Sequence, residues 1–168
     1  TTEPEALRAW FERGANKGSL TEYLEGFAVT CAVMQTDDGL ERVAFEALED
    51  LSQDGVAYAE LRFAPQFHCE RGLQAEAVVE SVLRGMARAE SEHGIRWGLI
   101  LCGMRGSPPA QNLKTAELAI AFRDRGCVGF DLAGDEFGHP PKDHLQAFQL
   151  CQRESFNITI HAGEAFGV

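Results

Sequence analysis

Residues 156–164 read Phe-Asn-Ile-Thr-Ile-His-Ala-Gly-Glu, a pattern typical of the end of a β-strand. Apolar residues occupy every second position up to residue 160 and polar residues lie between them, so the strand would end with His161 on its polar side. Ala162 and Gly163 are small enough for a tight turn that brings Glu164 close to the strand end. An imidazole and a carboxylate placed in this way are typical of a catalytic site, although many strands end in such a pair by accident.

Three earlier segments predict further strands, over residues 56–63, 95–104 and 127–132. Helices are expected over residues 3–13, from residue 19 onward, and over 38–54, 73–92, 112–125 and 141–154. Asp38 is a suitable N-cap for the third of these helices. The strands begin roughly 30 to 40 residues apart, which is the length of a βαβ unit, so we expect a parallel sheet with right-handed crossovers.

Charged side chains gather at the predicted C-terminal ends of all four strands. They are Glu60 and Arg62, then Arg105, then Asp131, and finally His161 and Glu164. Barrel enzymes and open α/β sheets both keep their active sites at this edge. Four charged strand ends in succession therefore favour an enzyme over a binding protein.

The composition is that of one globular domain, with 168 residues of which 45% are hydrophobic and 24% charged. A formal net charge of −11 argues against nucleic acid and anionic membranes as partners. We expect a small neutral or cationic ligand instead. No apolar stretch reaches the roughly 20 residues needed to cross a bilayer.

The five cysteines are scattered and form no CxxC pair. This usage indicates a reducing compartment, so we expect a cytoplasmic protein, and we assign none of the cysteines to a metal. The GxSxG, GxGxxG, P-loop and HExxH motifs are absent. His161 and Glu164 suit metal-assisted hydrolysis, but a zinc site needs at least three protein ligands and one strand cannot supply them.

Two strand ends resemble the adenosine deaminase family of zinc-dependent amidohydrolases. The match lies in residues 161–164, His-Ala-Gly-Glu, and in residues 129–136, Gly-Phe-Asp-Leu-Ala-Gly-Asp-Glu. Residues 59–65 and 104–105 are similar to the ends of that family's second and third strands. The resemblance runs from Leu20 to Val168.

This resemblance implies a (β/α)8 barrel of the TIM type, present here as an incomplete barrel with about four parallel strands, the family's second to fifth. It implies that His161 is a Zn²⁺ ligand, that Glu164 protonates the purine N1, and that the backbone of Gly134 binds the purine N3. Asp131, Arg105, Glu60 and Arg62 would support the site. The reaction would be the hydrolytic deamination of adenosine and 2′-deoxyadenosine to inosine and ammonia, so the partner is a purine nucleoside.

Four apolar residues near the N-terminus match the family's lid over the pocket, although their helical spacing fits a core-facing stripe equally well. They are Leu20, Tyr23, Leu24 and Phe27. We therefore expect one domain over residues 1–168, with a helical lid over about residues 1–36 and βα units over about residues 37–168.

The family's His-x-His pair, its later zinc-binding His and its paired Asp have no counterpart in the sequence, and a complete barrel takes about 250 residues. We therefore expect a piece of a deaminase that is inactive alone and that can self-associate through the exposed edges of its first and last strands. Two alternatives stay open. The complete protein could deaminate adenine or a modified adenosine, or the chain could be a non-catalytic α/β binding module with a doubly wound sheet.

Overall fold

The structure is a computed structural model that describes residues 3–15 and 20–165. Three helices come first, α1 (Pro4–Ala15), α2 (Leu20–Leu24) and α3 (Gly26–Val33), followed by α4 (Asp37–Gln53). The βα part then runs β1 (Tyr58–Phe63), η1 (Pro65–His68), α5 (Ala75–His93), β2 (Arg96–Met104), α6 (Pro109–Ala121), η2 (Arg123–Arg125), β3 (Cys127–Ala133), η3 (Pro141–His144), α7 (Leu145–Arg153) and β4 (Asn157–Ile158).

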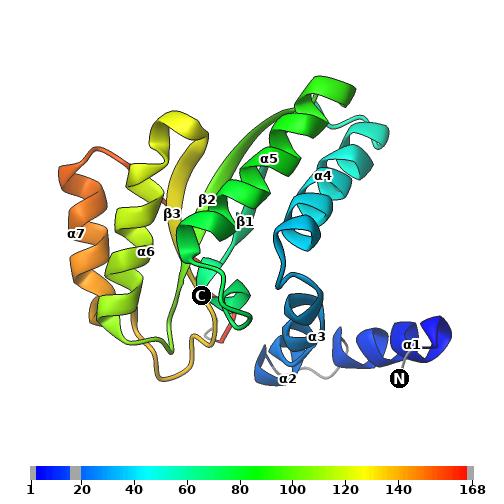
Figure 1. Cartoon of the computed structure of the whole chain (residues 1–168). Coiled ribbons are helices and arrows are strands. Elements are labelled where there is room, and N and C mark those ends of the chain that lie inside the picture. Colours follow the sequence, from blue (N-terminus) through cyan, green and yellow to red (C-terminus); the bar gives the residue numbers. More distant parts are fainter. Residues whose placement is uncertain (1–2, 16–19, 166–168) are drawn as a thin grey trace.

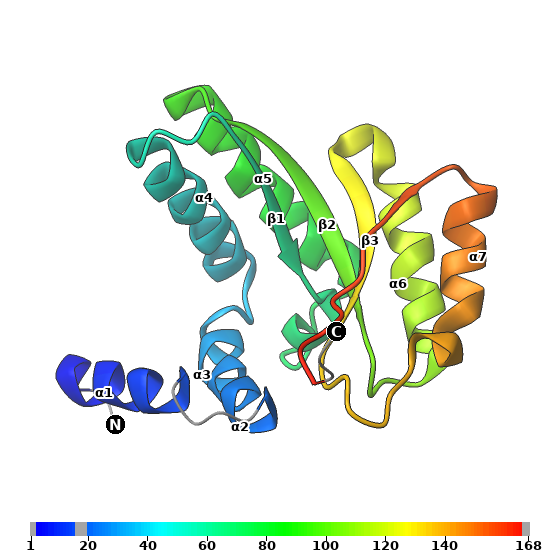
Figure 2. The same cartoon turned by 180° about the vertical axis from the view of Figure 1, so that it is seen from behind.

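The four strands form one sheet in the order β1-β2-β3-β4, and each neighbouring pair is parallel. Helices α5, α6 and α7 cover one face of this sheet, whereas no helix of the described residues covers the opposite face, which we call the open face (Figures 1 and 2). Helices on one side of successive parallel strands are the arrangement of a barrel wall rather than of a doubly wound sheet. The predicted α/β fold with four parallel strands is confirmed.

Successive side chains along each strand point alternately to the helix-covered face and to the open face. Phe130 on β3 is fully buried, and its ring packs edge-on against that of Phe148 on α7 (5.8 Å between centroids). In β1, Tyr58, Glu60 and Arg62 are exposed on the opposite face. The charged strand ends therefore lie on the side that the helices leave open.

The regular part of β4 is shorter than predicted, but the chain stays paired with β3 beyond it. Thr159 N–H donates to Phe130 O (2.9 Å) and His161 N–H donates to Leu132 O (3.0 Å). The backbone of His161 is therefore held in line with the end of β3, as the sequence pattern predicted.

Several helix boundaries differ from the predicted ones. The N-cap of α4 is Thr36, whose Oγ1 accepts a hydrogen bond from Gly39 N–H (3.1 Å), so the assignment of Asp38 as the cap was wrong. Asp38 lies in the first turn, where a carboxylate favours the positive end of the helix dipole. The helix expected from residue 19 onward is split into α2 and α3 at Glu25. Helix α6 starts at Pro109, because proline suits a first helical turn.

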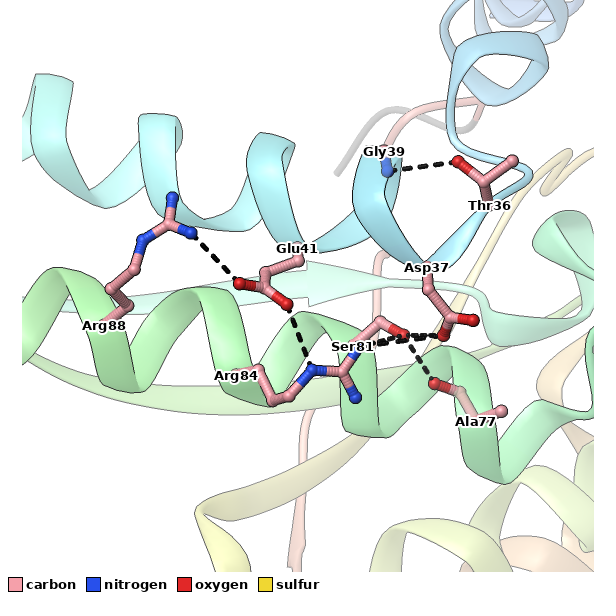
Figure 3. Close-up of polar contacts among 8 residues, drawn as sticks. All are labelled: Thr36, Asp37, Gly39, Glu41, Ala77, Ser81, Arg84 and Arg88. Carbon is pink, nitrogen blue, oxygen red and sulfur yellow. Dashed lines mark hydrogen bonds and ion pairs between the residues drawn. The ribbon is translucent and has the colours of Figure 1, made fainter.

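Helices α4 and α5 pack closely, and charged side chains line their junction (Figure 3). Glu41 on α4 accepts hydrogen bonds from Arg84 and Arg88 on α5, each at 3.0 Å. A Cβ atom on Gly85 would overlap the carbonyl oxygen of Glu41. The ion pairs are partly exposed and contribute little stability, so the absence of a side chain at residue 85 matters more to this contact.

In the described ranges, no helix is both long and apolar enough to span a membrane. All five cysteines are free thiols.

Candidate active site

Side chains from three strands meet on the open face of the sheet. Asp131 lies at the centre, with its Oδ2 atom 3.5 Å from Nε of Arg62 and 2.8 Å from Nδ1 of His161. Cys102 is paired with Asp131 in the β2–β3 register, and its thiol donates to the same oxygen (3.3 Å). The structure thus brings together three of the predicted site residues, Arg62, Asp131 and His161.

The carboxylate of Asp131 is fully buried. A buried charge is unfavourable unless opposite charge and hydrogen bonds compensate it, and Arg62 supplies the opposite charge here. Burial, followed by the negative charge of Asp131, raises the pKa of the Cys102 thiol, which therefore stays protonated and can donate. Oδ1 of Asp131 has no hydrogen-bond partner among the described residues. An unsatisfied buried oxygen of this kind is expected where a further group belongs.

His161 presents one ring nitrogen to Asp131 and leaves the other for a different partner. Its side chain is 23% exposed, and Nδ1 is the atom beside the carboxylate, at 2.8 Å but without the geometry of a hydrogen bond. A carboxylate next to one ring nitrogen is the arrangement that orients metal-binding histidines. Across residues 3–15 and 20–165, no group of three or more His, Cys, Asp or Glu side chains could hold a metal ion. The described residues therefore contain no complete metal site, and the role of His161 as a zinc ligand stays a prediction.

Two predicted carboxylates, those of Glu60 and Glu164, lie outside this cluster. Glu60 accepts a hydrogen bond from the hydroxyl of Tyr58 on the same strand (2.7 Å), and this bond is the main cause of a raised Tyr58 pKa. Glu164 is exposed in the turn after His161. The polar contacts of the described residues join neither carboxylate to Asp131.

Gly134 directly follows β3 and has a backbone conformation that other residue types rarely adopt. Its φ is +100°, in the left-handed region, and a Cβ atom there would lie 2.9 Å from Cε of Met104. Glycine is the residue for which this conformation carries no steric cost. The backbone conformation therefore explains why glycine occupies this position, whereas the binding of a purine by its backbone stays a prediction.

Arg105 is buried at the end of β2, with only 1% of its side chain exposed. Its guanidinium donates to two backbone carbonyls, His139 O (2.8 Å) and His161 O (2.6 Å). Nη2 also lies 3.9 Å from Oε1 of Glu136. The hydrogen bonds of Arg105 therefore go to the backbone of the site, and its charge also lies near the carboxylate of Glu136.

Glu136 was not singled out from the sequence, although it ends the quoted motif. Its Oε1 accepts from Gly163 N–H (3.2 Å) and its Oε2 from Ala165 N–H (2.9 Å). These two hydrogen bonds, first that of Ala165, hold the pKa of Glu136 below its ordinary value, and Glu164 N–H and the charge of Arg105 add smaller effects. Gly163 has φ +85°, which curls the backbone so that its N–H groups converge on one carboxylate.

Asn112 and His144 form a buried network that the sequence also did not reveal. Asn112 accepts from Met104 N–H and donates to Met104 O, both at 2.9 Å. Nε2 of His144 lies 2.9 Å from Arg105 O, and its Nδ1 lies 3.0 Å from Nδ2 of Asn112. Because a carbonyl can only accept, Nε2 carries the proton and Nδ1 accepts from the amide. These contacts join residues that are 8, 32 and 39 positions apart, so no local sequence pattern predicts them.

The apolar residues of the predicted lid are only partly packed in the described chain. Tyr23 and Phe27 are each 49% exposed, and their rings lie edge to face with centroids 5.8 Å apart. Leu20 and Leu24 are half-buried. A continuous core-facing stripe is therefore not formed here, and the role of these residues as a lid stays a prediction.

Gln35 ties the end of α3 to the loop after β1. Its amide donates to Cys31 O (3.0 Å) and Phe67 O (2.6 Å), and its Oε1 accepts from Glu70 N–H (3.1 Å). The Nδ1 atom of His68 adds a contact to Met34 O (2.9 Å). The N-terminal helices are therefore anchored to η1, near the C-terminal end of the first strand.

Comparison with known proteins identifies the family. The model of the adenosine deaminase family matches residues 1–168. The chain is 51% identical to adenosine deaminase 1 of Streptomyces coelicolor and 48% identical to adenosine deaminase of Mycobacterium leprae, covering 99% of this chain in both cases. It covers 43% and 47% of those two proteins, so it spans about half the length of the curated relatives it matches.

Solved structures share the fold over nearly the whole chain. Arabidopsis ADAL complexed with IMP is 26% identical, with a TM-score of 0.79 over 95% of this chain and 52% of its own. The adenine deaminase of Arthrobacter aurescens is 25% identical, with a TM-score of 0.79 over 97% and 54%. An amidohydrolase from Burkhoderia ambifaria with bound Zn is 22% identical, with a TM-score of 0.76 over 95% and 48%. The chain described here belongs to the adenosine deaminase family.

Proposed function

We propose that this chain forms one wall of the active site of a zinc-dependent adenosine deaminase, which hydrolyses adenosine and 2′-deoxyadenosine to inosine and ammonia. The observation that carries the proposal is His161, which the ladder to β3 and the buried Asp131 fix at the end of the sheet. The family match supports the reaction class.

The donors present fit a zinc site in part. His161 would bind zinc through Nε2, because Nδ1 faces Asp131. When bound, zinc would lower the pKa of a water molecule, so that a nucleophile able to attack the purine is available near neutral pH. At least two further protein ligands would come from outside the described residues, so we propose that the chain alone is inactive.

The chain's own residues would divide the remaining work. Glu164 donates a proton to the purine N1, which makes C6 more electrophilic, and so it must be protonated when substrate binds. Gly134 would bind the purine N3 through its backbone N–H, and the lack of a side chain on this residue would let the ring come close. Asp131 would orient the ring of His161, because its carboxylate faces Nδ1. Leu20, Tyr23, Leu24 and Phe27 would cover the bound purine and exclude water.

Replacement of Glu164 by Gln tests the proton-transfer role in the complete protein. The amide has nearly the same shape as the acid but cannot deliver its proton to N1, so we expect the kcat for adenosine to fall roughly 10²–10⁴-fold. The ultraviolet absorbance change on conversion of adenosine to inosine measures the rate. The Glu154→Gln variant, with an exposed carboxylate at the end of α7, is the matched control. Near-normal turnover by the Glu164→Gln variant would contradict the assignment.

A second candidate substrate is adenine, since an adenine deaminase shares the fold at 25% identity. A nucleotide is a third, because ADAL was solved with IMP. The identities of 48% and 51% with adenosine deaminases favour the nucleoside. If the kcat/KM for adenosine were below that for adenine or AMP, the nucleoside assignment would be wrong and the better substrate would take its place.

A further inference from the structure

The turn that follows His161 is held by side chains from two other strand ends. Residues 161–165 have no regular secondary structure, and β4 pairs with β3 alone among the described strands. The ladder bond to β3 in this segment is that from His161 N–H to Leu132 O, and residues beyond such a last bond at a sheet edge are free to fray. Whatever fixes its backbone therefore also fixes the direction of the side chains it carries.

Glu136 binds the N–H groups of this turn and Arg105 binds a carbonyl of it. The two carboxylate oxygens accept from Gly163 and Ala165, at 3.2 and 2.9 Å. Nη2 of Arg105 donates to His161 O at 2.6 Å and lies 3.9 Å from the same carboxylate. A charged acceptor and a charged donor thus bracket five consecutive residues, and hydrogen bonds to charged groups are the stronger kind.

Arg105 is itself held in place by hydrogen bonds to the rest of the fold. Arg105 N–H donates to Ala133 O (2.8 Å), and Arg105 O accepts from Nε2 of the buried His144 (2.9 Å). Asn112 holds both backbone groups of Met104, the preceding residue. Because these partners are buried and hydrogen-bonded, Arg105 has little freedom to follow the turn if the turn moves.

We propose that Glu136 and Arg105 are positioning residues that preset the turn 161–165, so that His161 and Glu164 are aimed at metal and purine before either binds. This inference rests on the proposed deaminase function for its catalytic consequence. The contacts themselves are made by side chains to backbone and involve no ligand, so the presetting can be measured without turnover.

The Glu136→Gln variant of the complete protein is the test. The amide NH₂ would face a backbone N–H, so one of the two hydrogen bonds becomes a clash of donors while the side-chain volume is kept. We expect faster hydrogen exchange at the amides of Gly163 and Ala165 in the metal-free protein. We also expect zinc affinity to fall about 10- to 100-fold by chelator competition, as for other residues that orient metal ligands.

The kinetic signature is a kcat that falls about 10-fold or more with a smaller change in KM, because the turn aims the reacting groups while other residues bind the purine. The Asp143→Asn variant removes an exposed charge from the neighbouring η3 and is the matched control, with exchange, zinc affinity and kcat expected to stay at wild-type values. Glu136→Asp keeps the charge on a shorter arm and should give intermediate losses, which also covers the case in which the amide variant does not fold.

Wild-type exchange at residues 163–165 together with wild-type zinc affinity in the Glu136→Gln variant would overturn the presetting role. If the wild-type protein did not deaminate adenosine at all, the proposed function would fail, whereas the exchange and zinc measurements would still decide whether Glu136 fixes the turn.

Discussion

At the scale of single residues, the turn between α7 and β4 holds a conformation that its sequence does not favour. Ser155 has φ +51°, and among the described residues it is the only one other than glycine with a positive φ. This region costs an ordinary L-residue about 1–2 kcal/mol. Glycine avoids that cost but loses more chain entropy on folding.

The Ser155→Gly variant is therefore expected to raise the free energy of unfolding by about 0.5–1 kcal/mol. Chemical denaturation measures the change. Ser155→Ala keeps the strained backbone and serves as the control, with no gain expected. Equal stabilisation in both variants would show that loss of the hydroxyl, and not relief of backbone strain, is responsible.

At the scale of the elements, the contact between α4 and α5 depends on Gly85. Alanine normally stabilises a helix interior relative to glycine by about 1 kcal/mol. Here the added Cβ would overlap Glu41 O, so we expect the Gly85→Ala variant to lose about 1–3 kcal/mol of stability in denaturant unfolding. Ser91→Ala, on an exposed position of α5, is the control and should be neutral or slightly stabilising. A stabilised Gly85→Ala variant would mean that the two helices separate easily.

The elements also show where sequence reasoning succeeds and where it stops. The strand pattern predicted that Arg62, Asp131 and His161 lie at the C-terminal ends of their strands and on the polar side of each, because parity fixes side-chain direction whatever the neighbours are. It could not reveal that Glu136 binds Gly163 and Ala165, 27 and 29 residues away, since that contact depends on how two loops fold over the sheet edge. The N-cap of α4 depends on local sequence alone. Thr36 and Asp38 are both residue types that suit an N-cap, so the sequence could not decide between them.

At the scale of the whole molecule, the described chain provides the open face of a sheet and, by our proposal, one histidine of a metal site that these residues do not complete. Both β1 and β4 have one unpaired edge among the described strands. We therefore expect the 168-residue chain, prepared alone, to bind zinc with less than one ion per chain and to self-associate through these edges. The complete protein is the control. Stoichiometric zinc by metal analysis, or a stable monomer at all concentrations in sedimentation, would contradict one or the other expectation.

The unpartnered Oδ1 of the buried Asp131 has a consequence for how this fold can be improved. Replacing the aspartate by a neutral side chain of similar volume would remove a buried charge whose compensation is incomplete, and such changes often stabilise a protein. The same change would take away the group that faces His161. Selection for thermal stability alone would therefore push this position away from aspartate, and its retention in an evolved variant would report that activity was also under selection.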